Sequence, residues 1–170
     1  MRILLGNLVE LKDVEVIVNA SNGRGPMGRG IAGCIGQAGG YVLRNAVRRI
    51  CEEAGGYKEG DCYISPSGNL INNGIKFVYH AVTMEYPGGP TSYDIVSKAM
   101  RATLDAAIKN EIKSIAFPGL GTGIGQLDLK RVATIMVKIA ESYSDRINIT
   151  IVDINKEFIT FAKEAKNTEE

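Results

Sequence analysis

Apolar runs alternate with amphipathic segments along this chain. Short runs such as "VEVIVNA" over 14–20 and "KSIAF" over 113–117 are apolar enough for strands buried on both faces. Longer segments such as "YVLRNAVRRICEEA" over 41–54 repeat apolar residues every three or four positions, which is typical of helices. The pattern predicts strands over 2–5, 14–20, 61–68, 75–82, 113–117 and 147–154, and helices over 41–54, 92–110, 129–143 and 156–166.

This alternation of strands and helices predicts the α/β class, with a mostly parallel central sheet covered by helices on both faces. Polar residues stand where three of the helices begin: Thr91 or Ser92, then Asp128, then Asn155. The length suits a single domain, which we place at 1–166, with 167–170 as a frayed tail.

The charge balance argues against some classes of partner. The formal net charge is only +1, whereas proteins that bind duplex nucleic acid usually show a basic excess. Three widely spaced cysteines, Cys34, Cys51 and Cys62, suggest neither a disulfide framework nor a metal site, so we expect free thiols in a reducing compartment. No signal peptide or membrane-spanning run is found, which favours a cytoplasmic protein with no membrane partner.

Two glycine-rich loops follow predicted strands. One is "GRGPMGRG" after 14–20, and the other is "GLGTG" after 113–117. Ligands of open α/β sheets bind at the carboxyl ends of the strands, where glycines allow main-chain amides to approach an anion. The sequence therefore predicts an anionic ligand held by two loops that face each other, with few lysines required.

Two common nucleotide motifs fit these loops poorly. The first loop lacks the Gly-Lys-Ser/Thr end of a P-loop. "GRGIAG" over 28–33 matches G-x-G-x-x-G, but Asn19, Ser21 and Asn22 separate it from the strand, so a nicotinamide-dependent dehydrogenase is a minor alternative. A purely structural role for the glycines, in tight turns and close packing, is the other alternative.

Five motifs in order resemble the macro domain, a family that binds ADP-ribose. They are "LGNLVELKDVEVIVNASN", "GRGIAGCIGQAGG", "GDCYISPSGNL", "KFVYHAV" and "SIAFPGLGTGIGQLD", and the resemblance spans about Leu4 to Ala162. It implies a three-layer α/β/α domain with a mixed, mostly parallel sheet. It also implies a ligand cleft across the carboxyl edge of that sheet, with no metal and no cofactor.

The resemblance assigns parts of the ligand to parts of the chain. The diphosphate would lie between Gly28–Gly33 and Gly121–Gly125, with Ile31 beneath it and Ile124 above it. The distal ribose would lie near Asn19, Asn22 and the Gly28–Gly30 main chain. The implied ligand-binding set is Asn7, Leu8, Asn19, Ser21, Asn22, Gly28, Arg29, Gly30, Ile31, Ala32, Pro118, Gly121, Thr122, Gly123, Ile124, Gly125, Val152 and Asn155.

The adenine end departs from the family pattern. Asn7 stands where the family usually has an Asp that accepts a hydrogen bond from the adenine amine. Val152 stands at a position that is often aromatic and stacked on adenine, so an aliphatic contact would replace the stacking. Asn155 or Phe158 could compensate.

The catalytic residues of the family's hydrolytic branches are also replaced. Ala32 stands where one branch has an Asp that helps to activate water, and an alanine cannot move a proton. A second branch uses a Lys and a loop acid, whose positions correspond here to Met84 or Glu85 and to Gly125. The remaining candidates are Asn22, which would orient the ribose, and His80, the single histidine, as a general base.

Three hypotheses for function stay open at this point. The chain is a non-catalytic ADP-ribose reader, or it hydrolyses ADP-ribose 1''-phosphate, O-acetyl-ADP-ribose or ADP-ribosylated protein. Outside this class, the same cleft could bind an adenylate or single-stranded nucleic acid.

Overall fold

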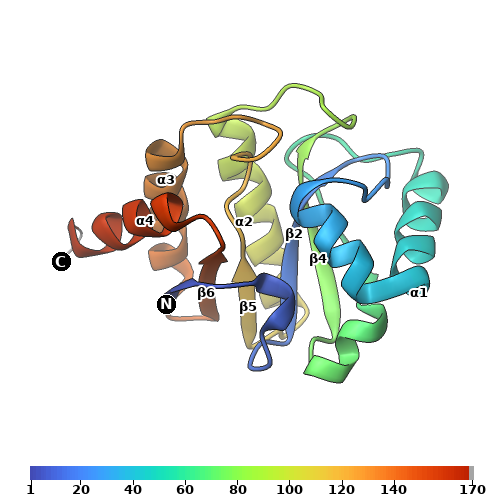
Figure 1. The fold of residues 1–170 in the computed structure, drawn as a ribbon, viewed down its shortest axis with the longest axis horizontal. Helices are drawn as coiled ribbons and strands as arrows, with labels where there is room; N and C mark the ends of the chain where they lie inside the picture. Colours follow the sequence, from blue (N-terminus) through green and yellow to red (C-terminus); the bar gives the residue numbers. More distant parts are fainter. Residues whose placement is uncertain (169–170) are drawn as a thin grey trace.

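The computed structural model describes residues 1–168 and forms a sheet with helices on both faces (Figure 1). Its strands are β1 (Arg2–Leu5), β2 (Val16–Asn22), β3 (Cys62–Pro66), β4 (Phe77–Met84), β5 (Ser114–Phe117) and β6 (Asn148–Asp153). Its α-helices are α1 (Gly30–Ala54), α2 (Tyr93–Lys109), α3 (Leu129–Tyr143) and α4 (Lys156–Thr168), and two 3₁₀ helices, η1 (Leu8–Glu10) and η2 (Gly68–Asn73), complete it.

The order of strands in the sheet explains why the two glycine-rich loops meet. The order is β1-β6-β5-β2-β4-β3, and all neighbours are parallel except β3 and β4. Because β2 and β5 are parallel neighbours, the loops that follow them leave the same edge of the sheet side by side. Figure 1 shows both loops at the upper end of the sheet. The predicted class, a mostly parallel mixed sheet in an α/β fold, is confirmed.

Successive residues of β2 supply the two cores. Val16 and Val18 belong to the core beneath α2, α3 and α4, whereas Ile17 belongs to the core beneath α1. This is the period of two that a strand imposes on its side chains. All three are fully buried, so the unbroken apolar run in the sequence reflects a strand that is covered on both faces.

The largest difference from the predicted elements lies in α1. This helix begins at Gly30, not near 41, and it is broken at Gly40, which has φ +78° and ψ −166°. The first segment was missed because its glycines weaken the periodic apolar pattern. At the other end of the chain, α4 continues to Thr168, so Asn167 and Thr168 of the expected tail are helical, and 169–170 lie outside the described residues.

The predicted caps are present at three helices. Ser92 Oγ accepts a hydrogen bond from the Ile95 amide at 3.2 Å, and Asp128 Oδ2 accepts one from the Arg131 amide at 2.9 Å. Asn155 Oδ1 accepts one from Phe158 at 3.1 Å. Each bond satisfies an amide that has no partner inside its own helix.

Two further findings concern membrane spans and metal-binding groups. Within 1–168, no helix is long and apolar enough to cross a membrane. In the same described part, the three cysteines are free, and no three His, Cys, Asp or Glu side chains are grouped to hold a metal ion.

Candidate functional site

A cleft of about 790 Å³ lies at the carboxyl ends of the central strands. The loops after β2, β4 and β5 form its rim, and the segments after β1 and β6 form one end. The volume is in the range usual for sites that bind small organic ligands. A cleft of suitable size therefore lies at the edge of the sheet where the sequence predicts a ligand site.

The first loop is built around the side chain of Asn22. Its Oδ1 accepts hydrogen bonds from the amides of Arg24 at 2.8 Å and Gly25 at 3.0 Å, while its Nδ2 donates to the Pro26 carbonyl at 2.9 Å. Both lone pairs of the oxygen and one of the two amide protons are therefore used inside the loop. Asn22 shapes the loop and keeps one N–H for a ligand.

The N-terminus of α1 faces this cleft without a cap. The helix begins after Arg29, whose side chain makes no capping hydrogen bond. Within the described residues, the amides of Gly30, Ile31 and Ala32 have no main-chain or side-chain acceptor, and Gly33 is the first to bond, to the Arg29 carbonyl at 3.0 Å. These free amides, together with the helix dipole, attract an anion.

The second loop exposes a further set of amides opposite the first. Gly121 has φ +75°, and its carbonyl accepts from the Leu127 amide at 3.0 Å, which closes the loop. Between them, Thr122, Gly123, Ile124 and Gly125 make no hydrogen bond through their amides within the described chain. Ile124, at 49% exposure, lines the cleft from this loop.

Few charged side chains line the cleft. Among the described lining residues, Arg29 is the one basic and Asp153 the one acidic side chain, and none is a lysine. Asp153 Oδ2 accepts from the Gly119 amide and Oδ1 from the Asn155 amide, both at 2.9 Å, so the carboxylate holds the second loop to the end of β6. The groups that can donate to an anion in the cleft are therefore main-chain amides and Arg29.

The end of the cleft between β1 and β6 is apolar with a polar edge. Val152 and the buried Leu8 form its floor, while Ile154 is 78% exposed beside them. Asn7 and Asn155 stand at the edge of this surface. Among the described lining residues no side chain is aromatic, in agreement with the expected aliphatic contact at Val152.

Every residue of the predicted ligand-binding set lines the cleft except Asn19. Asn19 is 1% exposed, and its Nδ2 lies 3.1 Å from His80 Nδ1 beneath the cleft. Its Oδ1 has no hydrogen-bond partner in the described chain. The expectation that Asn19 contacts the ribose directly does not agree with this geometry, because its side chain points into the interior of the domain to bond His80.

His80 lies in the same buried layer and does not reach the cleft. It is fully buried, and its Nε2 lies 2.9 Å from Ser65 Oγ, so both ring nitrogens have partners. Its ring also stacks on Tyr63, with centroids 4.4 Å apart. Burial lowers the pKa of His80 to about 3, so the ring is neutral at physiological pH. His80 therefore cannot act as the expected general base on a ligand in the cleft.

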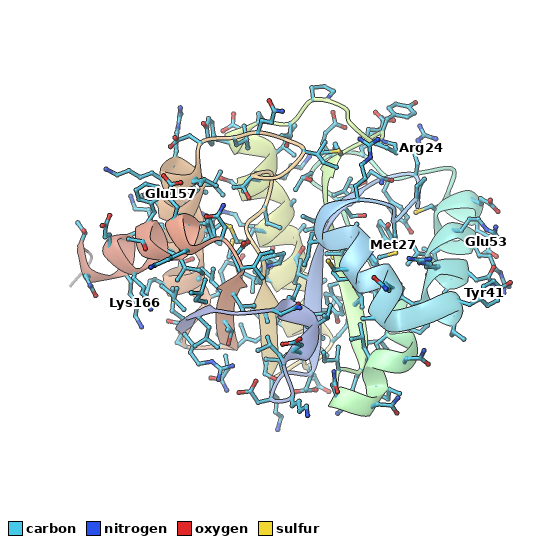
Figure 2. The ribbon with its side chains drawn as sticks, in the orientation of Figure 1. Arg24, Met27, Tyr41, Glu53, Glu157 and Lys166 are labelled. Atoms are coloured by element: carbon cyan, nitrogen blue, oxygen red, sulfur yellow. The ribbon has the colours of Figure 1, made fainter. Side chains whose placement is uncertain are left out.

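Glu85, which follows β4, is engaged outside the cleft lining. Its Oε1 accepts from Arg24 at 3.2 Å, and the same Arg24 nitrogen donates to the Tyr86 hydroxyl at 2.7 Å. Figure 2 shows Arg24 at the end of the sheet where these loops lie. The group ties the loop after β4 to the loop after β2.

Several lining residues were not predicted from the sequence. Thr83 and Met84 end β4, and Pro87 and Gly88 come from the loop after it. The turn-forming "YPGGP" of that loop follows a neighbour of β2 and was an available signal. Cys34 enters from the first turns of α1 and is exposed, although nothing in its sequence context marks it. The others are Gly6, Ala20, Pro26, Gly119, Asp153 and Ile154.

Comparison with known proteins identifies the family of this chain. The Macro domain family model matches residues 18–136. An uncharacterised protein of Aquifex aeolicus is 34% identical over 94% of this chain and 93% of its own length. A protein of Salmonella typhimurium named O-acetyl-ADP-ribose deacetylase is 30% identical over 86% of this chain and 80% of its own.

A solved structure shares the fold. An Oceanobacillus iheyensis macrodomain mutant, solved with ADPR, superposes with a TM-score of 0.85, at 22% identity, over 98% of this chain and 91% of that one. The family match, the relatives and the fold agree: this chain belongs to the macro domain family. The predicted resemblance is confirmed.

Proposed function

We propose that this protein binds ADP-ribose or an ADP-ribosyl derivative in the cleft between its two glycine-rich loops. The observation that carries the proposal is the set of free amides on both sides of the cleft, Gly30–Ala32 on one side and Thr122–Gly125 on the other. A diphosphate carries charge and several acceptor oxygens, so it suits two facing rows of N–H groups. The relative solved with ADPR supports the choice of ligand.

Binding is supported more strongly than catalysis. General acid–base catalysis needs an ionisable group within reach of the reacting bond. At the α1 end of the cleft the described lining residues include no acid, because Ala32 stands at the start of the helix and Asp153 lies at the end of β6. A reader of ADP-ribose is therefore the function that the residues of this site support best.

Hydrolysis of O-acetyl-ADP-ribose is the second candidate. The Salmonella relatives that bear the name O-acetyl-ADP-ribose deacetylase favour it. The reaction would add water to the ester and release acetate and ADP-ribose. Here the chain could act by positioning the ester and a water molecule, with the remaining Asn22 N–H directed to the ribose.

Calorimetry with ADP-ribose tests the binding proposal. A Cβ at Gly123 would have no atom within 4 Å, and its φ is not positive, so Gly123→Glu places a carboxylate in the cleft with little strain. Gly30 is a poorer choice, because its φ of +55° strains any side chain. We expect micromolar binding by the native chain, and a loss of about 100-fold or more in Gly123→Glu through repulsion of the diphosphate.

Gly123→Gln is the matched control, since it has nearly the same size without the charge. We expect it to lose much less affinity than Gly123→Glu, with equal melting temperatures. If the native chain shows no heat of binding with ADP-ribose, the proposal fails. Incubation with O-acetyl-ADP-ribose then separates reader from hydrolase, because acetate released above the rate in Gly123→Glu would establish turnover.

A further inference from the structure

The polar side chains at the β1–β6 end of the cleft are already bonded through their oxygens. Asn7 Oδ1 accepts from the Val9 amide at 3.2 Å as the cap of η1. Asn155 Oδ1 accepts from the Phe158 amide at 3.1 Å as the cap of α4. Each oxygen of Asp153 accepts one main-chain N–H. Each of these oxygens thus uses one lone pair inside the fold and keeps a second one.

This bonding fixes how each carboxamide is oriented. A main-chain N–H can only donate, so the atom that faces Val9 must be the oxygen of Asn7 and not its nitrogen. The Nδ2 group of Asn7 then lies on the other branch of the side chain, and no acceptor for it is found in the described chain. The same argument holds for Asn155. Each carboxamide at this end of the cleft therefore offers both an N–H donor and one remaining oxygen lone pair beside the apolar surface of Val152 and Ile154.

A carboxamide at this position does not distinguish the two kinds of purine, because its oxygen can still accept from the adenine amino group while its N–H can donate. It can donate to N1 of adenine or, equally, to O6 of a 6-oxopurine. The aliphatic surface of Val152 and Ile154 makes contacts that do not depend on the substituent at C6. Recognition of a purine without selection at C6 follows from these two features.

We propose, on the basis of the proposed function, that the cleft accepts nucleoside diphosphate-ribose ligands with adenine or a 6-oxopurine alike, and that Asn7 sets this tolerance. Asn7→Asp should change the selectivity. The carboxylate keeps the cap on Val9, since Asp and Asn are equally good N-caps, while its second oxygen becomes an acceptor for the adenine amine and repels O6.

The test is calorimetry with ADP-ribose and with inosine 5′-diphosphoribose. For the native chain we expect dissociation constants that differ by less than about threefold. For Asn7→Asp we expect a preference for ADP-ribose of about tenfold or more, the difference that one charge-assisted hydrogen bond supplies. Asn72→Asp, at an exposed position of η2 outside the cleft, adds the same charge and should keep the native ratio.

The outcomes separate this inference from the proposed function. If neither compound binds the native chain, the proposed function fails. If ADP-ribose binds at least tenfold more tightly than the inosine compound to the native chain, the inference is overturned while the function stands, and Asp153 is then the acceptor to examine. If Asn7→Asp leaves the ratio unchanged with its melting temperature intact, Asn7 does not set the selectivity.

Discussion

The four α-helices of the described chain begin in two different ways. Three begin with a side-chain cap, supplied by Ser92, Asp128 and Asn155. The fourth, α1, begins after Arg29 without one, and its first three amides have no partner within the described residues. At each capped end, a side chain of the folded protein accepts a hydrogen bond from one amide in the first turn of the helix.

This difference separates amides that serve the fold from amides that remain free for a ligand. A cap at the start of α1 would have been easy to provide, because Arg29 has the extended conformation of an N-cap, with φ −137° and ψ 158°. An arginine there adds positive charge at the cleft instead of a hydrogen-bond acceptor. The comparison predicts that a capping residue at position 29 raises the stability of the helix and lowers the affinity for the ligand.

The largest expected effect comes from giving α1 the cap that the other helices have. Arg29→Asp should stabilise the free protein by about 1 kcal/mol through a new cap on α1. The same carboxylate should weaken ADP-ribose binding by about 100-fold, since it occupies the free amides and repels the diphosphate. Melting temperature and calorimetry on one sample measure both changes.

Arg29→Gln is the control for that experiment. It removes the positive charge without supplying a strong cap, so its loss of affinity should be smaller and its stability close to native. Arg29→Ser, a neutral cap, should fall between the two in affinity. An Arg29→Asp protein that binds ADP-ribose as the native chain does would contradict the role given to the α1 amides.

The second effect concerns His80, whose ring nitrogens, like the amides at the capped helix ends, have hydrogen-bond partners inside the fold. His80 is neutral when folded because burial lowers its pKa to about 3. Unfolding returns its pKa to near 6.5, so the unfolded chain binds an additional proton as pH falls below that value. This group should therefore cost about 2 kcal/mol of stability between pH 7 and pH 5.

Urea unfolding of the native chain and of His80→Gln at both pH values isolates this contribution. The variant is expected to be less stable at pH 7, since it loses the stacking on Tyr63, but its stability should depend less on pH. An equal loss in both proteins over this range would show that His80 does not titrate as its burial implies.

The smallest effect is expected at a capped helix end that does not line the cleft. Asp128→Ala removes the acceptor for the Arg131 amide and should destabilise the protein by about 1 kcal/mol. Asp128 does not line the cleft, so calorimetry should give the native affinity for ADP-ribose. A tenfold loss of affinity would show that the two kinds of helix end are not independent.

Much of the fold could be predicted from local patterns. The β2 run around Ile17 is apolar throughout because both faces are covered, and the bounds of α3 match the predicted 129–143 because its apolar spacing is regular. The first segment of α1 could not be found in this way. Its glycines lower helix propensity, and packing on the sheet and the break at Gly40 decide its course.

The candidate site was predictable where main chain and motif define it, and less so where side-chain direction matters. Both glycine-rich loops line the cleft as expected. Asn19 and His80 do not, because they lie inside β2 and β4, before the carboxyl ends of these strands, and their side chains bond each other inside the domain. Asp153 and Ile154 were missed because they reach the cleft through the pairing of β6 beside β1.

The sequence by itself determined the order of strands and helices, the two glycine-rich loops and the family, because these depend on periodicity and on residue types at fixed spacing. Only the tertiary structure decided which amides remain free and which atom of each carboxamide faces the cleft. A hydrogen bond is made between specific atoms at short range, and whether Asn7 or Asn22 keeps a group for a ligand depends on partners that only the folded chain brings within reach.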